Sequence, residues 1–176
     1  MLDRVTLQAQ AKLNLTLEIT GRRADGYHLL RSVMQSVSIC DLLEIERSPE
    51  GWELRCDDPA LSCGEDNTVT RSMRAFVETA RPKGGVRIVL RKRLPYQAGL
   101  GSASADAAAT LLGLNLLFGE PLAADALAAL GLRIGADVPF GLQGGTMLAQ
   151  GIGEQLTPLP PLTGGVFVIA KPAEGM

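Results

Sequence analysis

The chain of 176 residues has few aromatic side chains, few cysteines and a single histidine. Aromatic residues make up 4% of the sequence, so leucine, alanine, valine and isoleucine must fill the core. The three cysteines, Cys40, Cys56 and Cys63, lack the paired C-x-x-C spacing that is typical of zinc sites. We therefore expect reduced thiols in a cytoplasmic protein.

A strong charge of one sign is also absent. The 17 lysines and arginines nearly balance the 19 aspartates and glutamates, which gives a formal net charge of −2. Such a chain has no general attraction to nucleic acid or to an anionic membrane, and we expect neither as a partner. The most apolar run, 111–118, is too short to cross a bilayer, and residues 1–5 lack the apolar core of a signal peptide. Any anion must therefore bind at a local site.

Enough apolar sequence is present to form one well-packed domain. Hydrophobic residues make up 46% of the chain and charged residues 20%, a balance that excludes disorder. Strict alternation from Leu13 to Ile19 predicts a strand over 13–19. Further strands are expected at 29–39 and 42–47, which are separated near Asp41, and at 52–56, 86–90, 146–150, 154–156 and 166–170.

Helical spacing predicts a helix over 69–80, with Asn67 as its N-cap and 82–85 as its stop. Two more helices are expected, over 102–118 and over 122–131. Strands come first in the chain, then helices, then short strands. This order indicates an α+β fold rather than a regular βαβ repeat.

The segment 94–108 has the strongest local pattern: a strand end, a glycine-containing loop and small residues that begin a helix. The first turn of a helix leaves backbone N–H groups unpaired and carries roughly half a positive charge, so it attracts phosphate. Gly99 and Gly101 allow close approach to the backbone, and Ser102 and Ser104 can donate hydrogen bonds or help to hold Mg²⁺. The pattern matches neither a Walker A loop nor G-x-G-x-x-G. The alternative is a well-capped helix packed on a sheet.

Four other positions have a chemical interpretation beside a plainer one. Lys12 is either a functional lysine or a solvated side chain, and the charge run 91–93 is expected to be a solvated strand end. Asp137 is either a helix N-cap or a partly buried carboxylate available as a base. Tyr27 and His28 can frame a planar ring or belong to an ordinary surface.

Together these segments resemble one family. In chain order they are A-K-L-N from Ala11, R-A-D-G-Y-H from Arg23, E-D-N ending at Asn67, the glycine loop, G-A-D-V-P around Asp137, and G-I-G-E from Gly151. They are similar to the motifs of the 4-diphosphocytidyl-2-C-methyl-D-erythritol kinases of the GHMP kinase superfamily, over essentially the whole chain. The resemblance implies a ribosomal-protein-domain-2-like sheet with helices packed on one side, and ATP with Mg²⁺ as cofactors.

The resemblance also implies a reaction and its residues. In that family ATP phosphorylates the 2-hydroxyl of 4-diphosphocytidyl-2-C-methyl-D-erythritol, in the non-mevalonate isoprenoid pathway. Lys12 and Asp137 would be the catalytic pair, with Asp137 as base and Lys12 offsetting negative charge. Asn67 would lie beside the adenine. The cytidine end would be held by Asn14, Tyr27 and His28, and the ATP phosphates by Pro95, Tyr96, Gln97, Ala98, Gly99, Leu100, Gly101, Ser102, Ala103, Ser104 and Ala105.

Two departures from the family pattern concern single positions. The family usually reads G-L-G-G-G-S-S-D/N, whereas this chain has G-L-G-S-A-S-A-D from Gly99. Ser102-Ala103 is similar to the G-L-G-S-S form of sister kinases, which leaves a homoserine or mevalonate kinase as an alternative, although D-G-Y-H argues against it. Gln150 stands where the family commonly has arginine.

The third departure is length, because the family has two lobes and is roughly half as long again or more. We therefore expect residues 1–170 to form the N-terminal ATP-binding lobe and 171–176 to begin the crossover to a C-terminal lobe that is missing here. The surface that this lobe normally covers would be apolar and would favour self-association. Transfer by this chain alone would be impaired, and a non-catalytic nucleotide-binding fragment is the alternative from another class.

Overall fold

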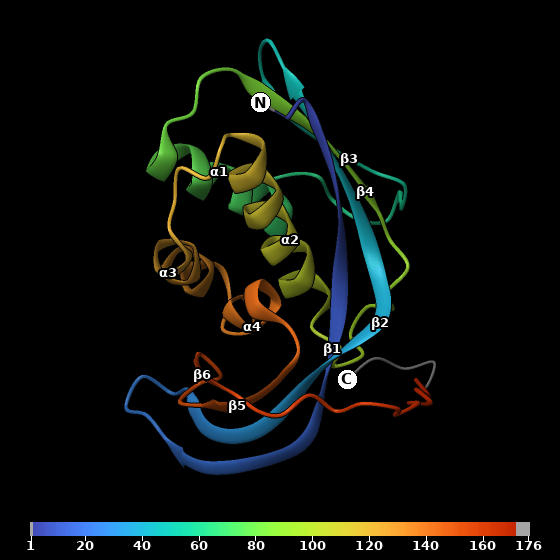
Figure 1. Cartoon of the computed structure of the whole chain (residues 1–176), viewed down its shortest axis with the longest axis vertical. Helices are drawn as coiled ribbons and strands as arrows, with labels where there is room; N and C mark the ends of the chain where they lie inside the picture. Colours follow the sequence, from blue (N-terminus) through green and yellow to red (C-terminus); the bar gives the residue numbers. More distant parts are fainter. Residues whose placement is uncertain (1, 172–176) are drawn as a thin grey trace.

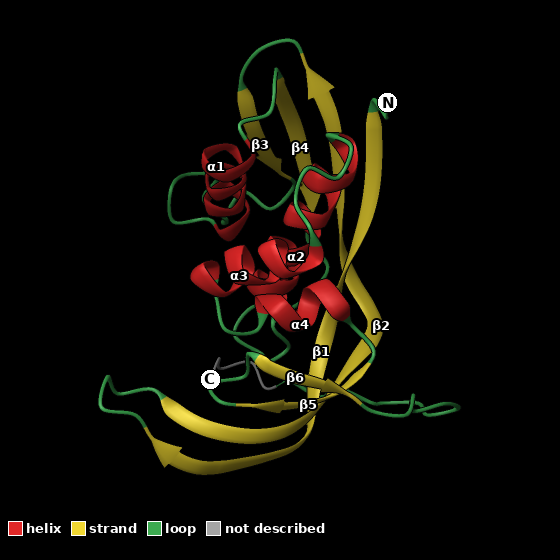
Figure 2. Ribbon diagram, turned by 60° about the vertical axis from the view of Figure 1, so that its left-hand side comes forward, coloured by secondary structure: helices red, strands yellow, loops and turns green. Residues whose placement is uncertain are grey.

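Two very long antiparallel strands dominate the computed structural model, which describes residues 2–171. They are β1 (Arg4–Arg22) and β2 (His28–Ser48), and they pair along almost their whole length. Figure 2 shows that both strands curve strongly at the end that carries their connecting turn. The register of this pairing shifts between Gln10 and Lys12 and at two later points.

The other edge of β2 is shared by two shorter strands. β4 (Gly85–Arg91) pairs with residues 42–48, and β5 (Thr146–Gln150) pairs with residues 32–35. β3 (Trp52–Cys56) lies parallel to β4, and β6 (Gln155–Pro158) pairs antiparallel with β5. The six strands therefore form one mixed sheet.

The four helices of residues 2–171 lie on one side of this sheet (Figures 1 and 2). They are α1 (Thr68–Ala80), α2 (Ser102–Leu117), α3 (Ala124–Ile134) and α4 (Val138–Gln143). Helix α2 is the central one, because it contacts β1, β2 and each of the other helices. Its small residues allow this position: a Cβ on Gly113 would lie 2.5 Å from Cδ1 of Ile45.

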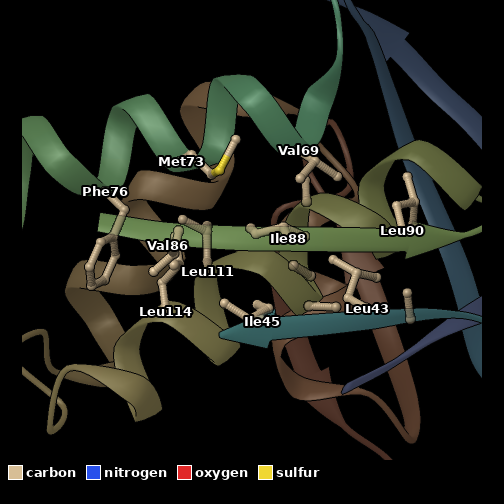
Figure 3. Close-up of a cluster of buried hydrophobic side chains, with 14 of the residues drawn as sticks. Leu43, Ile45, Val69, Met73, Phe76, Val86, Ile88, Leu90, Leu111 and Leu114 are labelled. Carbon is tan, nitrogen blue, oxygen red and sulfur yellow. The ribbon is translucent and has the colours of Figure 1, made fainter. Parts of the chain in front are cut away.

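The core fills the space between the helices and the sheet (Figure 3). Its fully buried side chains are aliphatic with one phenylalanine, as the low aromatic content requires. Each such side chain stabilises the fold by about 1.5–3 kcal/mol relative to exposure. The predicted α+β class, with helices on one side of a sheet, is confirmed. Figure 3 labels Leu43, Ile45, Val69, Met73, Phe76, Val86, Ile88, Leu90, Leu111 and Leu114.

The elements with local signals were predicted well. Asn67 caps α1 as expected, since its side-chain oxygen accepts a hydrogen bond from the N–H of Val69 at 2.8 Å. Helix α2 begins at Ser102, the predicted residue, and ends within one residue of the predicted end. Strands β3, β4 and β5 also lie where the alternation places them.

Other boundaries need correction. β1 begins at Arg4 rather than at Leu13, and the strands expected at 29–39 and 42–47 are one continuous strand. Asp41 does not interrupt it, because the buried carboxylate accepts hydrogen bonds from the backbone N–H groups of Arg93 and Leu94. Helix α3 lies later than predicted, and the short helix α4 begins directly after Asp137, where the N-cap interpretation of that residue implies a helix start.

The strand expected at 166–170 is not formed, because no strand in residues 2–171 pairs with it. Side chains of this segment are exposed, with Val166 at 92% and Val168 at 94%. Whether a second lobe covers these side chains, and whether they favour self-association, both stay predictions. The segment 171–176 lies outside the described residues apart from Lys171. Within the described part of the chain, no helix is both long and apolar enough to cross a membrane.

Candidate active site

Lys12 is buried in the middle of β1, where the sequence alone favoured a solvated side chain. Only 10% of its side chain is exposed, and its backbone N–H donates to the carbonyl of Leu100 at 2.9 Å. Ala11 and Lys12 are consecutive buried residues, which strict alternation does not allow. The register shift between Gln10 and Lys12 explains this break, because an irregularity of this kind re-aims a side chain.

The Lys12 ammonium lies 3.3 Å from Oδ2 of Asp137. Asp137 occupies the N-cap position of α4. Among the described residues, its side chain makes no capping hydrogen bond to that helix. Its carboxylate instead faces Lys12 and is 29% exposed. Of the two interpretations of Asp137, the partly buried carboxylate fits the structure.

Gly101 separates this ion pair from the loop that follows β4. Its φ of +70° lies in the left-handed region, and a Cβ there would lie 3.0 Å from Cγ of Lys12 and 3.8 Å from Oδ2 of Asp137. Gly153 approaches the same carboxylate from the β5–β6 connection, where a Cβ would lie 3.6 Å from Oδ1. Both glycines therefore leave room beside the Lys12–Asp137 pair.

A cavity of about 600 Å³ lies beside the start of α2. Helix α2 has Gly101 as its N-cap and no side-chain capping bond, and its first hydrogen bond runs from the N–H of Ala105 to the carbonyl of Gly101. The N–H groups of residues 102–104 are thus left for solvent or for an anion. The cavity is lined by Ala60, Leu61, Asp66, Asn67, Thr68, Lys92, Pro95, Tyr96, Gln97, Ala98, Gly99, Leu100, Gly101, Ser102, Ala103, Ser104 and Asp106.

The structure brings most of the predicted phosphate loop together at this cavity. Of the eleven residues, only Ala105 is outside the lining, because its side chain is on the buried part of α2. Asn67 lines the cavity from α1, and the hydroxyl of Thr68 donates to the carbonyl of Ala103 at 2.9 Å. Lys12 and Asp137 lie just beyond the lining, against Gly101.

The predicted substrate residues lie elsewhere, on the β1–β2 hairpin. Asn14 accepts a hydrogen bond from the hydroxyl of Ser32 at 3.1 Å. Tyr27 is 58% exposed at the tip of the hairpin, and His28, the first residue of β2, is also exposed. These three residues belong to the arm that starts near Lys12, and they lie outside the set that lines the cavity.

Lys92 was missed by sequence reasoning, and its assignment to a solvated strand end was wrong. Its side chain is only 5% exposed. Its ammonium donates to Asp106 Oδ2 at 2.7 Å and to Ser102 Oγ at 2.6 Å, and it also contacts Asp41 Oδ2. Asp41 in turn accepts the backbone N–H groups of Arg93 and Leu94. A network centred on Lys92 therefore ties β2, the end of β4 and the start of α2 together.

Two carboxylates share one ammonium in this network, and burial and these charges shift the pKa values of Asp106 and Lys92. Burial raises the pKa of Asp106 to about 7, although Lys92 acts in the opposite direction. Oδ1 of Asp106 has no hydrogen-bond partner among residues 2–171. Burial acts to lower the pKa of Lys92, but Asp106 and Asp41 outweigh it and the net pKa is raised. Lys92 therefore stays charged while Asp106 holds its proton readily.

The oxygen atoms near the start of α2 fit Mg²⁺ only as one or two of its ligands, with the nucleotide supplying the others. Mg²⁺ is usually held by one or two protein oxygens together with phosphates and water. The Ser102 hydroxyl is already bonded to Lys92, whereas the Ser104 hydroxyl has no hydrogen-bond partner in the described residues. No group of three or more histidine, cysteine or acidic side chains in residues 2–171 is arranged to hold a metal by itself.

Comparisons with known proteins agree with this geometry. Residues 67–148, which run from the α1 cap through the glycine loop to β5, match the GHMP kinases N terminal domain. A solved 4-(cytidine 5'-diphospho)-2C-methyl-D-erythritol kinase is 41% identical, with a TM-score of 0.77 over 88% of this chain and 55% of the other. A homoserine kinase structure from Cytophaga hutchinsonii reaches 0.69 at 24% identity, over 91% of this chain and 53% of the other, and so shows the fold alone.

Curated relatives show the same similarity along the sequence. The 4-diphosphocytidyl-2-C-methyl-D-erythritol kinase of Clostridium botulinum is 40% identical over 98% of this chain, and that of Carboxydothermus hydrogenoformans is 46% identical over 96%. The chain spans 61% of the first of these proteins and 58% of the second.

The fold is therefore that of the N-terminal domain of the GHMP kinases. Within that class, the resemblance to the 4-diphosphocytidyl-2-C-methyl-D-erythritol kinases that the motifs indicated is confirmed along nearly the whole chain.

Proposed function

We propose that this chain is the ATP-binding lobe of a kinase that phosphorylates the 2-hydroxyl of 4-diphosphocytidyl-2-C-methyl-D-erythritol, with 171–176 beginning the crossover to a second lobe. One observation carries the proposal: the Lys12–Asp137 pair lies against Gly101, the residue that caps α2 at the cavity. A nucleotide whose phosphates bind the start of α2 would present its terminal phosphate beside this pair. The family names of the relatives support the choice of substrate.

The residues of this chain supply three contributions to phosphoryl transfer. The N–H groups at the start of α2 hold the phosphates, and the charge of Lys12 stabilises the transferring group. Asp137 accepts the proton of the attacking 2-hydroxyl. The oxygen of that hydroxyl forms a bond to the γ-phosphorus, and the bond from the γ-phosphorus to ADP breaks so that ADP leaves. Mg²⁺ bound with the nucleotide would offset phosphate charge, with Ser102 and Ser104 as the nearest hydroxyls. Positioning and charge stabilisation are the main requirements of this reaction.

The substrate would bind along the hairpin arm. Asn14 lies two residues after Lys12 on β1, His28 begins β2, and Tyr27 ends the turn between them, so a ligand held by these residues would lie along the hairpin that carries Lys12. The adenine would lie at the other end of the cavity, near Asn67. The two ligands would then meet at Gly101 from opposite directions.

A non-catalytic nucleotide-binding fragment is the second candidate, because the cavity at the start of α2 can hold a nucleotide without any transfer step. The chain spans 61% of the Clostridium botulinum relative. In this case the cavity would bind ATP without transfer.

An activity assay separates these functions. ATP-dependent phosphorylation of 4-diphosphocytidyl-2-C-methyl-D-erythritol, homoserine and mevalonate is measured with this chain and with a version extended to the full length of the relatives. We expect turnover of the cytidyl substrate by the extended protein and little by this chain. Turnover of homoserine or mevalonate instead would show that the substrate is wrong. ATP binding without turnover in either form would favour the binding fragment.

A further inference from the structure

Two loops that frame the cavity are brought together by the parallel pairing of β3 with β4. The carboxyl ends of parallel strands emerge at the same edge of a sheet, so the loops that follow Cys56 and Arg91 start side by side. Asp57 links the two loops where they begin, because its Oδ1 accepts the backbone N–H of Lys92 at 2.9 Å. Beyond that point residues of both loops line the cavity.

Asp58 organises the first of these loops. Its Oδ1 accepts the N–H of Ala60 at 2.9 Å, and its carbonyl accepts the N–H of Leu61 at 3.2 Å. Ala60 and Leu61 line the cavity, as do Asp66 and Asn67 at the end of the same loop. The second carboxylate oxygen of Asp58 is thereby left to reach across to the other loop.

Tyr96, which lies on the predicted phosphate loop, is the partner of this second oxygen. Its hydroxyl donates to Oδ2 of Asp58 at 2.7 Å, and the Lys92 ammonium lies 5.5 Å from the centre of its ring. The hydrogen bond lowers the pKa of Asp58, while burial and the same carboxylate raise the pKa of Tyr96. Both directions keep the proton on the phenol and the charge on Asp58, which is the state that bonds most strongly.

The residue after Tyr96 has an unfavourable backbone conformation, so the loop needs a contact that holds it in place. Gln97 has a φ of 51°, in the left-handed region that a non-glycine residue rarely adopts. Backbone of this kind persists only where surrounding contacts hold it. The Asp58–Tyr96 bond is the contact next to Gln97, and it precedes the glycines that approach the phosphates.

We propose that the Asp58–Tyr96 hydrogen bond is a clasp that preorganises the phosphate loop, and that Tyr96 is thereby a positioning residue for nucleotide affinity. The clasp links the two walls of the cavity before any ligand binds, so the loop pays less ordering entropy on binding. The nucleotide part of this inference rests on the proposed function. The loop part does not, since it concerns the protein without ligand.

The test uses Tyr96→Phe, which removes only the hydroxyl and keeps the ring beside Lys92. Asp58→Ala and the double variant complete a cycle, and Glu53→Gln is the matched control, an exposed carboxylate on β3 that pairs with Arg55 and Arg87. Amide hydrogen exchange of residues 97–101 is measured without ligand, and the Kd for ATP is measured by calorimetry.

We expect exchange to be about fivefold faster and ATP binding about fivefold weaker in Tyr96→Phe, with Glu53→Gln unchanged. In the Asp58→Ala background, which also loses the bond to the N–H of Ala60, Tyr96→Phe should have no further effect, because the Asp58–Tyr96 bond is already absent; independent structural effects would add. Unchanged exchange in Tyr96→Phe would overturn the clasp. Faster exchange with unchanged ATP affinity would overturn the role in binding. Absence of ATP binding by the unmodified chain would overturn the proposed function and the role in binding together, while the exchange result still decides the clasp.

Discussion

Lys12 Nζ and Asp137 Oδ2 lie 3.3 Å apart although they come from a strand in the first part of the chain and a short helix near its end. The contact exists because a register shift turns Lys12 inward and because Asp137 leaves its own helix uncapped. A capping aspartate would have its oxygens committed to backbone N–H groups. This one keeps both for Lys12 and for a ligand.

Replacing Asp137 by Asn should remove the base while preserving the shape of the site. If the proposed function holds, we expect kcat of the version extended to the length of the relatives to fall by about 10²- to 10⁴-fold, the usual contribution of a general base. The Kd for ATP should change little, because the phosphates bind at the start of α2. The comparison is Asp125→Asn, an exposed acid in the first turn of α3. Equal turnover in the two variants would remove Asp137 from the base role.

Gly101 and Gly119 provide a matched pair for the phosphate loop. Both have left-handed backbones, with φ of +70° and +80°, so alanine at either should cost about 1–2 kcal/mol of stability. Only at Gly101 would the new Cβ meet the Lys12 side chain, at 3.0 Å, since nothing lies within 4 Å at Gly119. We expect Gly101→Ala to weaken ATP binding and transfer, and Gly119→Ala to affect stability alone. Similar ATP titrations for both variants would contradict the proposed position of the phosphates.

The parts of the fold that the sequence predicted are those with local causes. The Asn67 cap and the start of α2 at Ser102 depend on residues within a few positions. The 166–170 segment has the composition of a strand, but a strand needs a paired neighbour, and the described residues provide none. The alternation of Leu15, Leu17 and Ile19 was also seen correctly, yet all three are exposed, because alternation does not say what covers a face.

The candidate site was predictable only where a resemblance supplied the contact. Spacing alone favoured a solvated Lys12, because the register shift that buries it depends on β2 and cannot be seen in its own strand. Lys92 lies in a run of basic residues, and that run also predicts a solvated side chain, because the residues that bury Lys92 lie far from it in the sequence. Its partners Asp41 and Asp106 come from β2 and α2, and only the folded chain brings them together.

Asp41 should be among the most costly residues to remove. It is fully buried, and it holds Lys92 together with two backbone N–H groups. Asp41→Ala leaves those donors without this acceptor and should lower the free energy of unfolding by about 3–5 kcal/mol. Chemical denaturation measures this, with Glu46→Ala, an exposed position on the same strand, expected to change it by less than about 0.5 kcal/mol. A small effect at Asp41 would mean that the Lys92 network contributes little to the fold.

Asp106 should make the stability of the protein depend on pH in an unusual direction. Burial raises its pKa in the folded state from the usual 3.8 to about 7, so the folded chain binds the proton more tightly than the unfolded chain. This contribution to stability is fully present below about pH 4 and is lost as the pH rises through 7. At about 1.4 kcal/mol for each pKa unit, the total is about 4 kcal/mol.

Asp106→Asn removes that proton equilibrium while keeping the shape of the side chain, so its stability relative to the unchanged protein should rise by up to about 4 kcal/mol between pH 4 and pH 8. The charged groups that face Asp106 are Lys92 and Asp41, and both remain in this variant. Urea unfolding at each pH gives the difference directly, and contributions from other residues cancel in it. Glu53→Gln should change in the opposite direction, since the Arg55 and Arg87 hydrogen bonds lower the pKa of Glu53. A difference between Asp106→Asn and the unchanged protein that stays constant from pH 4 to pH 8 would show that Asp106 is ionised throughout.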